Sequence, residues 1–195
     1  MKKITFLAAF ALLAFTFSAQ AQIQKGNVMV GGNISDISFG LDNPNPFSLS
    51  LNPKAAWFIS DGVALGVDAK LGILAPGKGA GTAINYGVGA LGRYYGSTGA
   101  NTVLNNSRFF GEATIGINGI NPAGNEGSTN GLGFSFGPGY TYFITESVGI
   151  EALLKYTGTV GFGESAYAHS LGLGIGFQIY LPGKNTANKV QRDAR

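Results

Sequence analysis

The stretch SLGLGIGFQIYL, residues 170–181, alternates large apolar residues with small or polar ones at every step. Leucine, isoleucine and phenylalanine occupy the odd positions from Leu171 to Leu181, whereas serine, glycine, glutamine and tyrosine occupy the even ones. Successive side chains of a β-strand point to opposite faces. This period of two therefore predicts a strand with bulk on one face and little on the other.

The same alternation recurs in seven further segments and predicts eight strands. Tight hairpin turns are expected at residues 60–62 and 145–147, and longer connections rich in glycine, asparagine and proline lie between other strands. Asp36 and Ile37 break the phase of the first segment, which makes it the weakest of the eight. The predicted strands are residues 26–35, 47–59, 63–74, 84–96, 108–118, 132–143, 148–157 and 170–181.

The face without bulky residues indicates what surrounds the strands. It carries mostly glycine, serine, alanine and threonine, whereas a solvated exterior would be rich in lysine and glutamate. Such small residues suit the lumen of a narrow closed barrel, which leaves the bulky face to meet lipid. Closure pairs every backbone group, so a barrel can span a membrane. We therefore predict an all-β fold, an eight-stranded antiparallel up-and-down transmembrane β-barrel.

The amino terminus has the features of a secretory signal peptide. Two lysines precede an apolar run from Ile4 to Phe17, and Ala19-Gln20-Ala21 forms a small-residue cleavage site. The run is short for a membrane-spanning helix, which needs about 20 apolar residues. We expect a signal peptide at 1–21 with cleavage after Ala21, a barrel at 22–181 and a basic carboxyl-terminal tail at 182–195.

Composition excludes several classes of protein. The chain has no cysteine, so disulfide frameworks and thiolate metal sites are absent. The formal net charge is +3, but positive residues concentrate in the signal peptide and the tail. Residues 22–181 hold seven basic and nine acidic residues, a net charge of −2. This body offers no basic face for nucleic acid.

Charged residues stand on the sparse face of the predicted strands, which would point into the lumen. Buried charges must pair with charges of opposite sign. A symmetric turn at 60–62 would place Lys54 across from Asp68. We expect a ladder of mixed sign that fills the lumen, either as a static polar core or as a gate whose pairs exchange. Its members would be Lys54, Asp68, Lys70, Arg93, Glu112, Glu151 and Lys155.

Aromatic residues gather at one end of alternate strands. Four strands that would run in the same direction end in or near aromatic residues, which predicts a girdle at the level of the lipid headgroups. The alternative is an ordinary aromatic core. The predicted girdle consists of Trp57, Phe58, Tyr94, Tyr95, Tyr142, Phe143 and Tyr180.

A resemblance to a known family rests on two strands, SLNPKAAWF at 50–58 and FGPGYTYF at 136–143. Each is followed by a tight turn and an alternating return strand. The chain resembles the small outer-membrane β-barrel proteins of Gram-negative bacteria, of the OmpA and OmpX type, over about residues 24–181. The resemblance implies an outer-membrane location, periplasmic termini, a monomer, and assembly by the barrel assembly machinery. That machinery reads a final aromatic strand, here GFQIYL at 176–181.

Three functions follow from this reading. The first is a closed structural or interaction barrel, with outer-membrane lipid around it and a possible external ligand at its loops. The second is a narrow porin-like channel for water, ions or small solutes. The third is a lipid-modifying enzyme. The external loops would be residues 40–46, 75–83, 119–131 and 158–168.

Chemistry-bearing residues are few. His169, the single histidine, adjoins Ser170, and adjacent strand residues point to opposite faces, so the two cannot act as base and nucleophile. One histidine and no cysteine leave only oxygen-rich metal sites, and no spacing typical of them is present. We therefore expect no enzyme activity and no cofactor.

Overall fold

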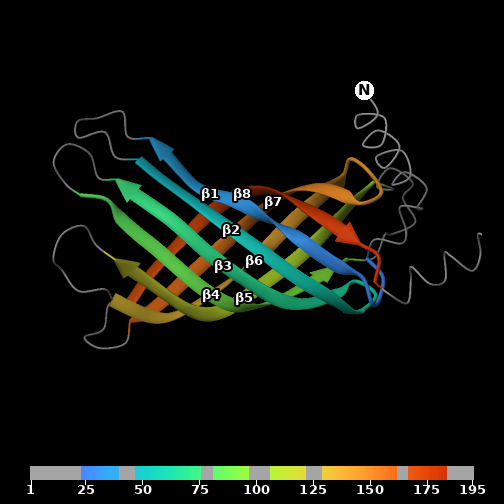
Figure 1. Ribbon diagram of the computed structural model, residues 1–195, viewed down its shortest axis with the longest axis horizontal. Helices are drawn as coiled ribbons and strands as arrows, with labels where there is room; N and C mark the ends of the chain where they lie inside the picture. The colour runs from blue at the N-terminus through green and yellow to red at the C-terminus, as the bar shows by residue number, and fades with distance from the viewer. Residues whose placement is uncertain are drawn as a thin grey trace, which may run out of the picture.

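The eight predicted strands are present, and they close into one antiparallel barrel (Figure 1). The computed structural model describes residues 23–39, 47–75, 81–96, 106–121, 129–161 and 167–183. Each strand pairs with its sequence neighbour, and β1 pairs with β8, so no edge strand remains. No helix among the described residues is long and apolar enough to cross a membrane. The strands are β1 (Val28–Phe39), β2 (Phe47–Ser60), β3 (Val63–Ala75), β4 (Ala83–Tyr95), β5 (Ser107–Asn121), β6 (Thr129–Phe143), β7 (Val148–Gly161) and β8 (Tyr167–Leu181).

Several strands extend further than the sequence pattern predicted. β7 continues to Gly161, because Thr159 and Val160 keep the alternation through a stretch that reads as a loop. Because the strands on either side extend further, the predicted external loops at 75–83, 119–131 and 158–168 are shorter than expected. Their central parts lie outside the described residues. The predicted loop at 40–46, the predicted signal peptide with Ala21, and the tail beyond Gly183 also lie outside them.

The phase break in the first strand is a β-bulge. The pairing of β1 with β2 shifts its register between Ser35 and Ser38, and β1 then continues to Phe39. A bulge inserts an extra residue on one strand, which resets the alternation. The strand therefore ends later than the residue at which the sequence pattern fails.

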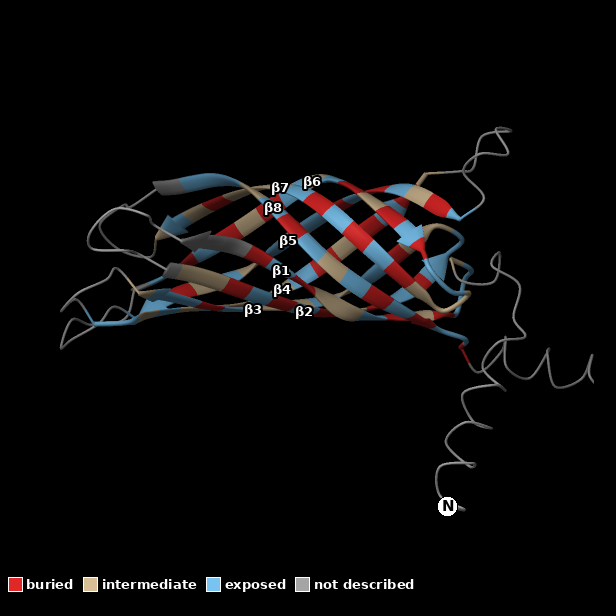
Figure 2. Ribbon diagram, turned by 90° about the horizontal axis from the view of Figure 1, so that it is seen from above, coloured by how far each residue is buried: buried red, intermediate tan, exposed pale blue. Residues whose placement is uncertain are grey.

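Exposure follows the predicted alternation around the barrel, as the striped strands in Figure 2 show. Large apolar side chains such as Leu171, Ile115 and Val88 lie on the outer surface. Each charged side chain that the structure describes within a strand occupies a position that faces the lumen. These residues are Lys54, Asp68, Lys70, Arg93, Arg108, Glu112, Glu151 and Lys155.

The apolar outer band has the height of a membrane. On β8 the outward residues run from Leu171 to Leu181, and on β4 they run from Ile84 to Tyr94. A rise of about 3.3 Å per residue over such a stretch gives roughly 33 Å along the strand. A strand tilt of about 40° reduces this to an axial height of about 25 Å, the height of the apolar band of outer-membrane barrels.

Candidate functional site in the barrel lumen

Four buried charged side chains meet inside the lumen, and we call them the charge layer. Lys54, Arg93, Glu112 and Glu151 come from β2, β4, β5 and β7. Side-chain exposure is at most 2 % for all four. Arg93 and Glu112 are direct cross-strand partners, so the β4–β5 register itself brings them together.

Arg93 is the centre of the charge layer. Its Nη1 donates to Glu151 Oε2 at 2.7 Å, and its Nη2 donates to Glu151 Oε1 at 3.1 Å. Its Nε donates to Glu112 Oε2 at 2.9 Å, and Nη2 makes a second bond to that oxygen. Lys54 Nζ donates to both oxygens of Glu112, at 2.7 and 2.9 Å. Two cations thus balance two anions, and the layer carries no excess charge.

Two buried amides complete the surroundings of Glu151. Asn33 Nδ2 and Gln178 Nε2 each donate to its Oε1 at 2.9 Å. Neither amide is among the predicted lumen residues. The alternation shows that both face inward. Gln178 reaches Glu151 across the β7–β8 hairpin, whereas Asn33 reaches it only because barrel closure pairs β1 with β8.

Five aromatic side chains fill the lumen between the charge layer and the end of the barrel at which β1 begins and β8 ends. We call them the aromatic plug. Tyr95 donates or accepts a 2.7 Å hydrogen bond with the Tyr180 hydroxyl, and Arg93 Nη1 donates to Tyr95 at 2.9 Å. The guanidinium carbon of Arg93 lies 4.1 Å from the centre of the Phe110 ring. The charge layer and the plug are therefore continuous. The plug consists of Phe58, Tyr95, Phe110, Phe143 and Tyr180.

The plug corrects the predicted girdle. Four of its seven members, Phe58, Tyr95, Phe143 and Tyr180, point into the lumen instead of outward. The physical reason is the alternation itself, because only one residue of each consecutive aromatic pair can face outward. The three members that do face outward are Trp57, Tyr94 and Tyr142, which are 53 %, 61 % and 50 % exposed. Phe109, which was not predicted, also lies on the outer surface and is 63 % exposed.

Residues 23–27 lie beside the plug and pair with the end of the β2–β3 hairpin. Ile23 packs against the buried cluster, and its carbonyl accepts a hydrogen bond from Gly62 N at 3.0 Å. Gly26, with a φ of 91°, donates to the carbonyl of Phe58 at 2.8 Å. Asn27 Oδ1 accepts a bond from Gly183 N at 3.1 Å, which ties the residue before β1 to the segment after β8. These contacts hold residues 23–27 against the plug.

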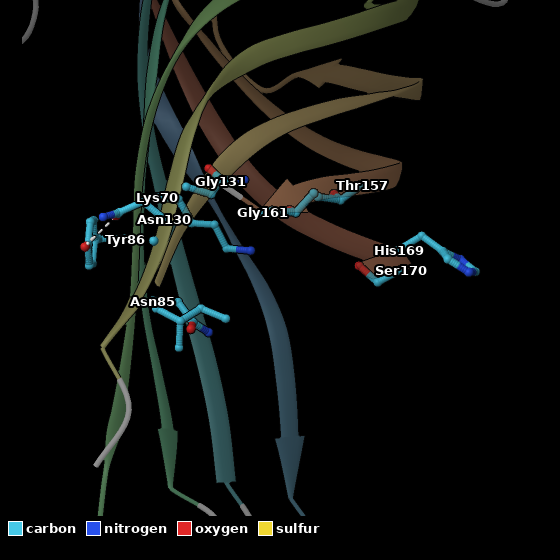
Figure 3. Close-up of a pocket in the computed structure, with 13 residues that line it drawn as sticks. Lys70, Asn85, Tyr86, Asn130, Gly131, Thr157, Gly161, His169 and Ser170 are labelled. Atoms are coloured by element: carbon cyan, nitrogen blue, oxygen red, sulfur yellow. Dashed lines mark hydrogen bonds between the residues drawn. The ribbon is translucent and has the colours of Figure 1, made fainter. Parts of the chain in front are cut away.

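The lumen on the far side of the charge layer is hollow, and we call it the cup. One cavity in it has a volume of about 320 Å³ and is lined by residues of β3 to β8 (Figure 3). Two adjoining cavities of about 30 Å³ each lie among the same strands. The residues that matter for its chemistry are Asp68, Lys70, Asn118, Lys155, Thr157 and Ser170.

The seven predicted lumen charges thus occupy two places. Four form the charge layer, whereas Asp68, Lys70 and Lys155 line the cup. Lys54 and Asp68 are cross-strand partners in the β2–β3 ladder. The Lys54 amine nevertheless reaches across the lumen to Glu112 on β5, where it completes the charge layer.

The geometry offers no catalytic pair at the single histidine. His169 and Ser170 project to opposite sides of β8 in Figure 3, and the His169 ring stacks on Tyr156 at 6.2 Å. Among the described residues, no group of three or more histidine, aspartate or glutamate side chains could hold a metal ion.

Comparisons with known proteins bear on the fold. The sequence matches no protein family and no curated protein. Among solved structures, the chain is similar to Neisserial surface protein A, with 18 % identity over 78 % of this chain and 95 % of that one, at a TM-score of 0.54. It is also similar to the outer membrane protein OprG from Pseudomonas aeruginosa, with 14 % identity, 84 % and 99 % coverage, and a TM-score of 0.49. The fold is that of small eight-stranded outer-membrane barrels.

Proposed function

We propose that this chain is an integral outer-membrane barrel with a closed lumen, which presents the cup and its loops to the outside and keeps both termini in the periplasm. The observation that carries the proposal is the double closure of the lumen. The charge layer and the aromatic plug lie one behind the other, and both are almost inaccessible to solvent. A solute that enters the cup therefore meets a floor and no passage.

Membrane insertion is supported by the outer surface. The apolar band is about 25 Å high, the height that spans the hydrocarbon core of an outer membrane. Charged side chains in the described strands share the inward alternation, away from this band. Lipid is thus the partner of the outer surface, and the barrel assembly machinery is the partner during biogenesis.

Bilayer recordings test closure. The refolded chain is expected to produce no stable channels in planar bilayers, provided that it first shows different gel mobility with and without boiling. Glu151→Gln is expected to remain silent as well, because Gln178, Asn33 and the aromatic plug still fill the lumen. Its folded band should convert to the unfolded one at a lower temperature, since Arg93 loses a charged partner. Reproducible conductance by the folded chain would contradict closure and favour a channel.

Trp57 reports on the membrane contact. It is the only tryptophan, it lies on the outer surface, and it stands near the plugged end of β2. On refolding into lipid vesicles, its emission is expected to shift to the blue. Lipids brominated near the headgroup should quench it more than lipids brominated near the chain ends, because tryptophan prefers the interface. Emission that stays red and unquenched would show that this surface does not meet lipid.

A further inference from the structure

We infer that a gap between β1 and β8 is a lateral binding site for a single-chain carboxylate, of the chemical class of the fatty acids. The carboxylate would enter the gap from the side, while the chain stays in the surrounding lipid. The inference goes beyond the proposed function: it rests on the membrane placement of the barrel and does not depend on the closed floor.

The barrel closes over only part of the length of β1 and β8. The two strands pair as far as Ile34 and Ile175, although β1 continues beyond this pair and β8 begins before it. The β-bulge of β1 lies where the pairing ends. Among the described residues, Tyr167–Gly174 pairs only with β7. We call the gap between this stretch and Ser35–Phe39 of β1 the seam.

Part of the seam lies at the depth of the lipid. The apolar outer band on β8 begins at Leu171, so the stretch from Leu171 to Gly174 falls inside it. Four residues at about 3.3 Å each give a gap about 13 Å long. Backbone groups without a strand partner do not occur at this depth unless they are buried in protein or line a cavity that holds water. The seam is therefore a polar opening in an apolar wall.

A small cavity lies directly behind the seam. It is lined by Ser35 of β1 and by Gly172 and Gly174 of β8, so it touches both sides of the gap. Its volume of about 30 Å³ has room for about two water molecules, which is close to the size of a carboxylate group. A phosphate with its ester substituents is larger than this space. The volume therefore favours a carboxylate over the headgroup of a phospholipid.

Lys155 is the residue that would bind the carboxylate. It lines the cavity and is the cross-strand partner of Gly172, which places no side chain between Lys155 and the seam. Within the part of the chain that the structure describes, Lys155 forms no ion pair, and Asp68 lines a neighbouring cavity but not this one. Lys70 also lines the cavity but is engaged by other groups. An ammonium donates strong, charge-assisted hydrogen bonds to a carboxylate.

The outer face of β8 offers a surface for the chain. Leu171, Leu173 and Ile175 are each more than 60 % exposed and follow one another along the seam toward the middle of the band. A chain that lies on these residues keeps its methylene groups in lipid while its carboxylate reaches Lys155. One anionic head of small volume and one apolar chain together define the class of the ligand.

Tryptophan quenching in phosphatidylcholine vesicles tests the inference. Trp57, the only tryptophan, is replaced by phenylalanine, and Ile175→Trp sets a reporter beside the seam. At a low ratio to lipid, 9,10-dibromostearate is expected to quench this reporter, and excess stearate should relieve the quenching. Methyl stearate, which lacks the charge, should not relieve it. In the control, Ile115→Trp replaces Ile175→Trp as the reporter on the outer face of β5, and stearate should relieve no quenching there.

Two lysine variants of the reporter chain locate the carboxylate. Lys155→Met should weaken the binding of dibromostearate at least tenfold, whereas Lys25→Met, at the plugged end, should leave it unchanged. Gel mobility with and without boiling shows that each variant is folded. Should Lys155→Met not fold, the comparison of stearate with methyl stearate still decides the outcome.

Three results would overturn the inference: quenching beside the seam that stearate does not relieve, equal relief by methyl stearate, or unchanged binding in folded Lys155→Met. Conductance in planar bilayers is measured separately. A conducting barrel would contradict closure and leave the seam site standing, whereas a silent barrel without stearate binding would contradict the seam site alone.

Discussion

Arg93→Met is expected to lower the free energy of unfolding of the barrel by about 3–5 kcal/mol, the usual cost of removing one partner from a buried ion pair. The substitution keeps much of the side-chain length but leaves Glu112 with Lys54 alone and removes the charged partner of Glu151. Glu151 would retain only the amides of Asn33 and Gln178. Urea titration in lipid vesicles, followed by the fluorescence of Trp57, measures the loss.

The loss does not measure how much the ion pairs stabilise the fold. A buried salt bridge gains Coulomb energy but loses the hydration of both ions, and the two contributions nearly cancel. The cost appears when one charge is removed and the other stays buried. Arg93→Lys therefore tests the geometry, because an ammonium keeps the charge but lacks the planar fork that binds two carboxylates. Arg93→Lys should lower the free energy of unfolding, but by less than Arg93→Met does.

Arg108→Met provides a control at an arginine that is only partly buried. Arg108 also faces inward on the alternation of a strand, but it lies outside the charge layer and donates to the backbone carbonyl of Ser107. Its removal leaves no buried carboxylate without a charged partner in the charge layer. A loss for Arg108→Met as large as that for Arg93→Met would contradict the central role of Arg93.

The barrel itself could be predicted from sequence because its cause is local. Each strand repeats the same period of two, and residues such as Leu171 and Gly172 show by their size which face meets which surroundings. The inward direction of Arg93 and Glu151 follows from the same rule. Within a hairpin the turn fixes the register, which is why the pairing of Lys54 with Asp68 could be anticipated from one short turn.

The composition of the lumen layers could not be predicted in the same way. Phe58 and Tyr95 lie on different strands, and their ring centres approach within 6.0 Å only because the barrel curves around a narrow axis. Closure also decides that Lys54 bonds to Glu112 and not to its cross-strand neighbour Asp68. Side-chain partners across a lumen depend on barrel radius and strand stagger, which single-strand patterns do not encode.

Phe110→Ala is expected to be the second severe substitution, with a loss of about 3–5 kcal/mol, as for other buried phenylalanines. The Phe110 ring packs beside Tyr95 with its centre 5.5 Å away and lies against the guanidinium of Arg93. It also covers Gly139 of β6, where the absence of a side chain leaves room for the ring. Alanine would open a cavity at this junction and expose the face of Arg93 that the ring now shields.

Phe109→Ala is the control that separates packing inside the lumen from contact with the surroundings. Phe109 is the neighbouring residue of the same type, but its ring lies on the outer surface. In thermal unfolding in detergent micelles, detergent covers Phe109 in both the folded and the unfolded state, so its truncation should cost little. On unfolding, Phe110 loses its packing partners in the lumen and is covered by detergent instead. Its truncation should therefore lower the midpoint temperature of unfolding strongly. Equal shifts for both variants would mean that the plug contributes no more to stability than the lipid-facing surface, and the floor of the cup would then rest on the charge layer alone.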